Sequence, residues 1–142
     1  APVGLSPEPE PVPSLTDIAG LRILVLDDEE GVREGMATLL GSLGCMPLLA
    51  SNIDGALAAA GSGIDLVLSD LRLRGAEDGI EAIRRLRLQH PGLPALLVSG
   101  DTAPQRLRDA DAAALTMLHK PVSVGVLTRA IRAQISQRSA GR

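Results

Sequence analysis

The chain of 142 residues contains no Phe, Tyr or Trp and a single Cys. Aliphatic side chains must therefore fill the core, and no aromatic ring can stack on a nucleobase. A lone Cys excludes an internal disulfide, and the apolar segment around Cys45 indicates a buried thiol. A net charge of −3 without a basic block argues against direct nucleic-acid binding.

Long apolar runs are also missing: none approaches the roughly 20 residues that cross a bilayer. The N-terminus lacks the charged-then-apolar pattern of a signal peptide. The length fits one ordinary domain. We therefore expect a cytoplasmic domain that makes no membrane contact itself, although a parent protein could be membrane-anchored.

The composition changes near residue 20. The opening stretch APVGLSPEPEPVPSL holds five of the ten prolines, which fix φ and remove amide donors. We predict a linker at residues 1–19, a domain at 20–137 and a short tail at 138–142. Because the chain begins with Ala, we expect a longer parent protein with a domain upstream. A natural disordered tail is the alternative.

Five aliphatic runs alternate with helical patterns from Arg22 onward. The runs are RILVL (22–26), CMPLL (45–49), IDLVLS (64–69), ALLVS (95–99) and ALTML (114–118). Four apolar helix faces contain Val32, Met36, Leu39, Leu40 and Leu43; Ile53, Ala56, Leu57 and Ala60; Ile80, Ile83 and Leu86; and Val124, Leu127, Ile131 and Ile135. Another helix is predicted from Thr102, which has capping-box spacing to Gln105.

Continuous apolar runs that alternate with helices indicate a parallel sheet covered on both faces. We predict an α/β doubly wound (βα)5 fold, a flavodoxin-like three-layer sandwich with strand order 2-1-3-4-5. One residue tests this order: Pro47 lies inside the second run and cannot donate to a strand ladder, so that strand should be an edge. The order 2-1-3-4-5 places it there.

Polar side chains follow four of the five runs. They are Asp27, Asp28, Asp70, Ser99 and Lys120. Because ligands of open α/β sheets bind at the carboxyl ends of the strands, near the switch in strand order, these side chains should converge. Each alone has an ordinary reading: either early aspartate could cap the first helix, Asp70 and Ser99 could be loop residues, and Lys120 could be solvated.

Together these residues suggest chemistry. Three adjacent carboxylates would raise one another's pKa unless a cation held them. Oxygen ligands at a shallow site favour Mg²⁺, which leaves room for phosphate. Lys120 could neutralise a phosphoryl oxygen, and Ser99 could donate a hydrogen bond to another. This set suits phosphoryl transfer to a carboxylate.

At this point the sequence resembles the receiver domain of two-component response regulators. The matching residues are Asp27-Asp28 after LRILVL, Asp70 ending IDLVLSD, Ser99 in LLVSGD, and Lys120-Pro121, within about residues 20 to 136. The resemblance implies that Asp70 accepts phosphate from a phosphohistidine. It implies that Mg²⁺ (or Mn²⁺) is held by Asp27, Asp28, Asp70 and the backbone carbonyl of Arg72.

The resemblance assigns further roles. Ser99 is the implied switch hydroxyl and Lys120 the phosphoryl clamp, with a cis Lys120–Pro121 bond. Met117 occupies the switch position that is usually Tyr or Phe, so an aromatic toggle is impossible here. The loop LRLRGAED lacks the usual Met-Pro and is one residue longer than expected before Gly79. His119 is read as a partly exposed neighbour.

Three stretches of the sequence are most similar to receivers at the C-terminus of hybrid sensor histidine kinases. They are DLRLRGAEDGIEAIRRLR, LLVSGDTAPQRL and LHKPV. A stand-alone receiver is the competing arrangement. The implied partner is a histidine kinase or histidine phosphotransfer domain. Such a receiver catalyses its own phosphorylation and dephosphorylation, while the parent would be a histidine kinase. A homodimer through the Thr102 helix, the fifth strand and the closing helix is a further expectation.

Two other functions are weighed against this one. An Mg²⁺-dependent phosphohydrolase would use an aspartyl nucleophile at Asp27, for which Asp27 with Glu29 is a poor match and no cap domain is present. A degenerate receiver would act only as a docking module, which the intact set of polar residues opposes. The arginines Arg84, Arg85, Arg106 and Arg108 are read as a solvated face rather than a docking site.

Overall fold

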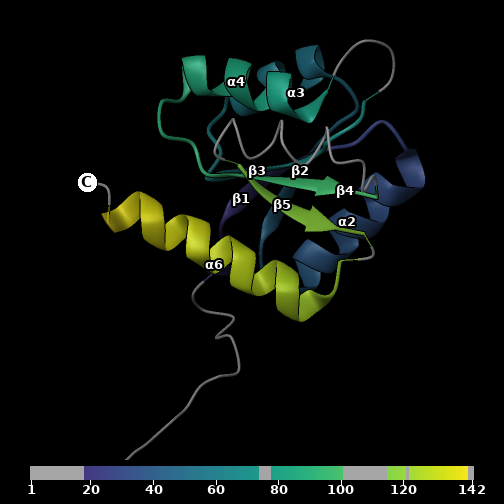
Figure 1. Ribbon diagram of the computed structural model, residues 1–142, viewed down its shortest axis with the longest axis vertical. Coiled ribbons are helices and arrows are strands. Elements are labelled where there is room, and N and C mark those ends of the chain that lie inside the picture. The colour runs from purple at the N-terminus through teal and green to yellow at the C-terminus, as the bar shows by residue number, and fades with distance from the viewer. Residues whose placement is uncertain (1–17, 74–77, 101–114, 121, 141–142) are drawn as a thin grey trace, which may run out of the picture.

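Five parallel strands form one sheet in the order β2-β1-β3-β4-β5 (Figure 1). The structure is a computed structural model, and it describes residues 18–73, 78–100, 115–120 and 122–140. The strands are β1 (Arg22–Leu26), β2 (Met46–Ala50), β3 (Leu66–Asp70), β4 (Ala95–Ser99) and β5 (Thr116–His119). The described helices are α2 (Glu30–Ser42), α3 (Ile53–Ala60), α4 (Gly79–Gln89) and α6 (Val124–Ala140). The predicted doubly wound, flavodoxin-like fold and its strand order are confirmed.

Helices cover both faces of this sheet, with α3 and α4 on one side and α2 and α6 on the other (Figure 1). Successive strand residues point to opposite faces, so each strand supplies both layers. In β1, for example, Leu24 and Leu26 belong to the core under α3 and α4, and Ile23 and Val25 belong to the core under α2 and α6. Apart from Cys45, the buried apolar side chains are aliphatic, as the missing aromatics require.

The edge position predicted for the second run is confirmed. β2 pairs only with β1 among the described strands, and Pro47 lies opposite Ile23. The amide of Met46 donates to Leu21 O, and the amide of Asp27 donates to Ala50 O. Backbone groups alternate along a strand, so those of Pro47 face away from β1. The missing N–H of Pro47 therefore removes no bond from the sheet.

Three helices begin with the side-chain caps expected from short polar residues, α3 at Asn52, α4 at Asp78 and α6 at Ser123. Asn52 accepts a hydrogen bond from Gly55 N at 2.7 Å, and Asp78 accepts one from Glu81 N at 2.8 Å. The N-cap of α2 is Glu29, rather than either aspartate before it, and its side chain makes no capping bond. The helix predicted from Thr102 lies outside the described residues.

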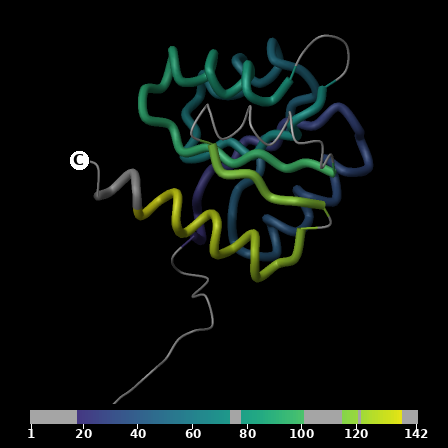
Figure 2. The backbone as a smooth tube through the Cα atoms, viewed as in Figure 1, coloured from purple at the N-terminus to yellow at the C-terminus, as the bar shows by residue number. Residues whose placement is uncertain are grey.

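The packed part of the chain includes Ile18, which the sequence analysis placed in the linker. Ile18 is fully buried in the core under α2 and α6, and its carbonyl oxygen lies 3.4 Å from the sulfur of Cys45. Cys45 is buried, as predicted, and burial raises the pKa of its thiol. At the other end, the tube in Figure 2 runs from β5 into α6, which passes back beneath the sheet and extends to Ala140. No helix in the described ranges has the length and hydrophobicity to cross a membrane.

Candidate phosphoacceptor and metal site

Asp27 lies between β1 and α2. Its amide, its carbonyl oxygen and its Oδ1 each form a hydrogen bond, and its Oδ2 faces a charged partner. Its amide donates to Ala50 O at 3.1 Å, and its carbonyl oxygen accepts from Arg33 Nη1 at 2.7 Å. Its Oδ1 accepts the Glu29 amide at 2.9 Å, a local turn typical of Asp. Its Oδ2 lies 3.8 Å from Lys120 Nζ. Asp27 therefore has a fixed orientation at the carboxyl end of β1.

Asp70 is the last residue of β3, and the start of α4 passes closely behind it. The amide of Gly79 donates to Leu71 O at 2.7 Å. A Cβ on Gly79 would lie 2.8 Å from both Ser69 Oγ and Leu97 Cδ2, and it would also overlap the carbonyl oxygen of Asp70. Only glycine fits this approach. In the sequence, Gly79 is recognisable only as the end of a loop.

Lys120 reaches the same place from the end of β5. Its amide donates to Ser99 O at 2.9 Å, which continues the pairing of β4 and β5 beyond His119. Its Nζ lies 3.6 Å from Asp70 Oδ1, and its side chain is 31% exposed. These separations are too long for hydrogen bonds, so charge attraction joins the lysine to the acids. The lysine thus faces both Asp27 and Asp70.

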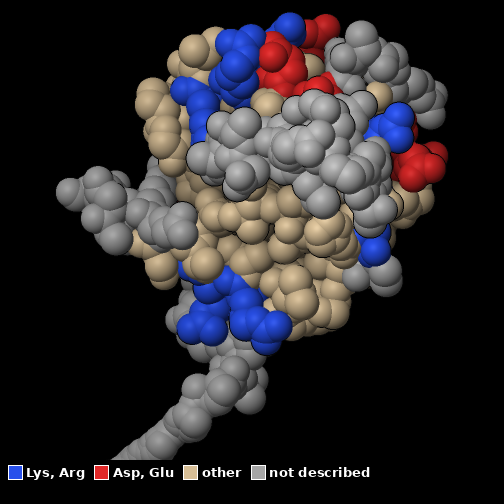
Figure 3. Space-filling view, in the orientation of Figure 1, with Lys and Arg blue, Asp and Glu red and all other residues tan. Residues whose placement is uncertain are grey.

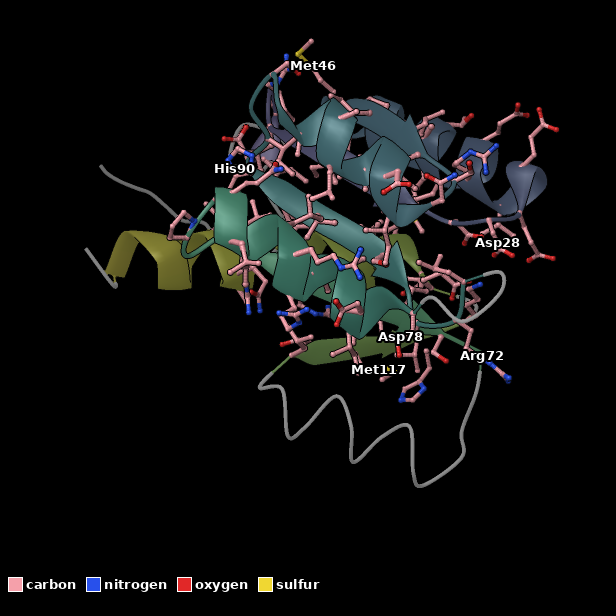
Figure 4. All side chains as sticks on the ribbon, turned by 90° about the horizontal axis from the view of Figure 1, so that it is seen from above. Asp28, Met46, Arg72, Asp78, His90 and Met117 are labelled. Carbon is pink, nitrogen blue, oxygen red and sulfur yellow. The ribbon has the colours of Figure 1, made fainter. Side chains whose placement is uncertain are left out.

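The three predicted carboxylates converge. One ligand oxygen from each of Asp27, Asp28 and Asp70 lies within 4.8 Å of the others. Figure 4 shows Asp28 and Arg72 at one end of the sheet, and Met46 and His90 toward the opposite end. The acids therefore gather at the carboxyl ends of the strands, where the sequence analysis placed them.

Burial and mutual repulsion leave the acids poorly compensated. Burial, reinforced by the negative charge of Asp27, raises the pKa of Asp70 to about 6, although Lys120 acts in the opposite direction. Burial also raises the pKa of Asp27 above its ordinary value, against the opposing effects of the Glu29 amide and Lys120. A cation bound between these groups would relieve both effects.

Asp27 and Asp70 border a cavity of about 440 Å³ that lies on the α2 and α6 side of the sheet. Its polar residues are Asp27, Ser69, Asp70 and Lys120, and its apolar residues are Val25, Leu26, Val32, Met36, Leu68, Val98 and Val122. Val32 and Met36 were expected simply to pack as a helix face, but Val32 is 36% exposed and both residues line this cavity. Helical periodicity cannot distinguish a cavity wall from a filled core.

Two predicted switch residues, Ser99 and Met117, are not among the residues that line the cavity. Ser99 is buried at the end of β4, on the same strand face as Leu97, which lies opposite Met117 of β5. Met117 is half-buried against the core under α3 and α4. Pro121 lies outside the described residues, so the cis Lys120–Pro121 bond stays a prediction.

The predicted metal ligand Arg72 begins the loop after β3, where it forms an isolated antiparallel bridge with Asp78. Its side chain is exposed and points away from the sheet in Figure 4. The predicted role belongs to its backbone carbonyl and stays a prediction.

The donor set fits a hard divalent cation. Mg²⁺ prefers oxygen ligands and commonly uses one or two carboxylates together with water and phosphate oxygens. Asp27, Asp28 and Asp70 would supply the carboxylates. Burial, followed by the charge of Asp27, raises the pKa of Asp70, and a bound cation would favour its ionised form.

Comparison with known proteins identifies the family. Residues 23–132 match the response regulator receiver domain. The chain belongs to this family. The receiver fold is also found in solved structures: NtrX from Brucella abortus matches 87% of this chain and 29% of its own, with a TM-score of 0.79 and 28% identity. A receiver domain protein from Clostridium thermocellum matches 86% of this chain and 99% of its own, with a TM-score of 0.76 and 24% identity, which bears on the fold alone.

Curated relatives of this receiver include transcriptional regulators. The transcriptional regulatory protein FixJ of Bradyrhizobium diazoefficiens is 32% identical over 117 residues, which are 81% of this chain and 57% of FixJ. The KDP operon transcriptional regulatory protein KdpE of Escherichia coli is 32% identical over 120 residues, which are 83% of this chain and 52% of KdpE. The receiver spans about half the length of these relatives.

Proposed function

We propose that this receiver accepts a phosphoryl group on Asp70 from a phosphohistidine donor, with Mg²⁺ (or Mn²⁺) bound by the acidic cluster. The observation that carries the proposal is the meeting of three carboxylates within 4.8 Å, with Lys120 Nζ at 3.6 Å from Asp70. The bordering cavity leaves space for the transferred group.

In the proposed step, a carboxylate oxygen of Asp70 attacks phosphorus. A P–O bond forms, the P–N bond to the donor histidine breaks, and its electron pair stays on the imidazole nitrogen. The product is an acyl phosphate. Attack requires the ionised form of Asp70. Because the pKa of Asp70 is raised, the reaction depends on the groups that favour the carboxylate, which are Lys120 and the bound cation.

Several residues of this chain would share the charge compensation. Bound Mg²⁺ supplies charge neutralisation at the phosphoryl oxygens. Asp27 and Asp28 would hold that cation, and Lys120, whose Nζ lies 3.6 Å from Asp70, would approach a phosphoryl oxygen from β5. Positioning and charge neutralisation are the main contributions that proteins make to phosphoryl transfer.

The proposed response of the fold involves Ser99 and Met117. Ser99 would donate a hydrogen bond to the phosphoryl group, and Met117 would repack as Ser99 moves. The flexible, half-buried thioether of Met117 suits repacking. The backbone carbonyl of Arg72 is proposed as a further metal ligand, and a cis Lys120–Pro121 bond as the means of aiming Lys120.

The proposed donor is a histidine kinase or a histidine phosphotransfer domain in the cytoplasm. A hybrid sensor histidine kinase is the proposed parent, with residues 1–19 as a linker whose end packs on the receiver at Ile18, 20–137 as the receiver and 138–142 as a tail. The sequence stretches that resemble hybrid-kinase receivers support this parent.

A homodimer is proposed through β5, α6 and the segment between β4 and β5. Val124 and Val126 of α6 are 49% and 40% exposed. Figure 3 shows a broad surface without charged side chains above the Lys and Arg residues at its lower edge. Such a surface suits an interface core.

The test of phosphorylation is incubation with acetyl phosphate and Mg²⁺, followed by intact-mass spectrometry and peptide mapping. We expect the wild type to gain one phosphoryl group on Asp70 and Asp70→Asn to gain none. Asp54→Asn, on exposed α3, is the matched control and should be phosphorylated normally. Stoichiometric phosphorylation of Asp70→Asn would show that the acceptor lies elsewhere, and label on Asp27 would favour a phosphohydrolase.

A further inference from the structure

Arg33 connects the first helix to the acidic cluster. It lies in α2 six residues after Asp27, and its Nη1 donates to the carbonyl oxygen of Asp27 at 2.7 Å. The amide of Arg33 donates to Glu29 O at 2.9 Å, so the backbone of Arg33 is fixed by the helix. The side chain therefore spans from a defined helix position back to the end of β1.

The start of α2 has little other local stabilisation. Its N-cap Glu29 provides no side-chain bond. Gly31 and Gly35 flank Arg33, and nothing lies within 4 Å of the position that a Cβ would take at either glycine. Glycine in a helix is unfavourable by roughly 0.5–1 kcal/mol relative to alanine. Neither glycine is required by packing, so the first turns of the helix are weak without the bond from Arg33.

The bond from Arg33 also determines what Asp27 can offer to a cation. With its amide and carbonyl already bonded, Asp27 cannot rotate about its backbone without breaking one of these bonds. Its Oδ1 stays on the Glu29 amide, and its Oδ2 stays directed toward the side of Lys120 and Asp70. Groups that orient ligands in this way typically change metal affinity 10–100-fold.

We propose that Arg33 is a positioning residue, which holds the Asp27-Asp28 pair in the geometry that binds the divalent cation. This inference rests on the proposed function, because it concerns the same metal site. It predicts a sign. Removing a positive charge near a cation site should tighten Mg²⁺ binding if charge repulsion dominates, whereas loss of positioning should weaken it.

The test is a titration of the full chain with MgCl₂. Binding is monitored through the backbone amide NMR signals around Asp27 and Asp28. We expect Arg33→Met to bind Mg²⁺ about tenfold more weakly than the wild type. Arg33→Lys keeps a donor but loses the planar fork, so its Kd should lie between the two. Arg85→Met, which removes an exposed arginine bonded to Glu81 on α4, is the control and should bind like the wild type.

A second-site variant separates positioning from general stability. In the Arg33→Met background, Gly31→Ala with Gly35→Ala should restore part of the Mg²⁺ affinity by stabilising the start of α2. Gly41→Ala, at the far end of the same helix and also in open space, should leave the affinity unchanged. Urea unfolding of each variant, followed by far-UV circular dichroism, gives its stability separately.

Other outcomes would overturn the inference. An Arg33→Met variant with unchanged or tighter Mg²⁺ binding would exclude positioning, even if transfer from a phosphohistidine donor became slower, which would indicate donor docking. Equal rescue by Gly41→Ala would reduce the role to global stability. If Arg33→Met does not fold, unchanged binding by Arg33→Lys would overturn the inference. A wild type that binds no Mg²⁺ would overturn the proposed metal site as well, which distinguishes the two failures.

Discussion

Burial makes the negative charge of Asp70 unfavourable in the folded protein, so stability should depend on pH. The pKa of Asp70 is about 6 in the fold, against an ordinary value of 3.8. The folded state therefore binds this proton more tightly, and its stabilising effect is present below about pH 4 and is lost as the pH rises through 6. We expect Asp70→Asn to raise the free energy of unfolding at pH 7 by on the order of 2 kcal/mol relative to the wild type.

The measurement is urea unfolding at several pH values between 4 and 7, without divalent cations. Other groups titrate in this range, so the difference between the wild type and Asp70→Asn reports Asp70 together with its coupling to Asp27. Parallel curves for the two proteins would contradict the raised pKa. Saturating Mg²⁺ should reduce the difference, because a bound cation favours the ionised carboxylate.

Gly79 gives a second prediction at the scale of single residues. Gly79→Ala would place a methyl group against the Asp70 carbonyl and within 2.8 Å of Ser69 Oγ. We expect a loss of about 1–3 kcal/mol in unfolding free energy. Phosphorylation by acetyl phosphate should also fall, because relief of the overlap moves the end of β3. Full stability and normal phosphorylation would show that α4 can shift without affecting Asp70.

The sequence predicted the site residues that end strands, and it missed those that hold them. Asp27, Asp70 and Lys120 could be placed because the carboxyl ends of parallel strands share one edge. Arg33 and Gly79 act through a single hydrogen bond and a close backbone approach. Such contacts depend on the angle at which a helix meets the sheet, which residue spacing does not encode.

Among the secondary structure elements, α2 should be the easiest to stabilise. We expect Gly35→Ala to raise the free energy of unfolding by about 0.5–1 kcal/mol, since nothing lies near its Cβ position and alanine restricts the unfolded chain. Gly44→Ala should have the opposite effect, because Gly44 has φ +87° and its Cβ would lie 3.1 Å from Ala19 Cβ. Urea unfolding measures both changes. A stabilising Gly44→Ala would contradict this conformational argument.

Periodicity predicted the elements better than their ends. The runs at 22–26 and 95–99 match β1 and β4, whereas β2, β3 and β5 each extend one residue beyond the predicted run and β3 and β5 also begin two residues later. Asp70 and His119, the last residues of β3 and β5, are polar, so hydrophobicity alone does not include them. Strand limits depend on the pairing partner, as in the match of Asp70 with Val98.

At the scale of the whole molecule, Mg²⁺ binding should increase the stability of the folded state. A ligand that binds only the folded state at 100 times its Kd stabilises it by about 2.7 kcal/mol. We expect thermal unfolding, followed by far-UV circular dichroism, to shift upward with MgCl₂ in the wild type. The shift should be largely absent in Asp28→Asn, and Asp54→Asn should respond like the wild type. Equal shifts in all three proteins would indicate a general salt effect.

The fold of the described residues could be predicted from the alternation of apolar runs and helices. Pro47 predicted that the second strand lies at the edge of the sheet. The identity of the parent protein did not follow, because receiver domains are similar whatever they are joined to. The curated relatives illustrate this point, since the chain spans only 57% of FixJ and 52% of KdpE. Physical constraints on a core act within one domain and carry no information about its neighbours.

The outward rim of β2 has a consequence for crowded conditions. Between Met46 and Ala50, the backbone positions that face away from β1 are Pro47 and Leu49, and only Leu49 retains an amide hydrogen. An incoming extended peptide would find one amide donor where a regular strand offers two, so it cannot form a regular ladder of hydrogen bonds along the outer edge of β2. Replacement of Pro47 by a residue with an amide hydrogen would restore the second donor and make this edge better suited to pair with another chain.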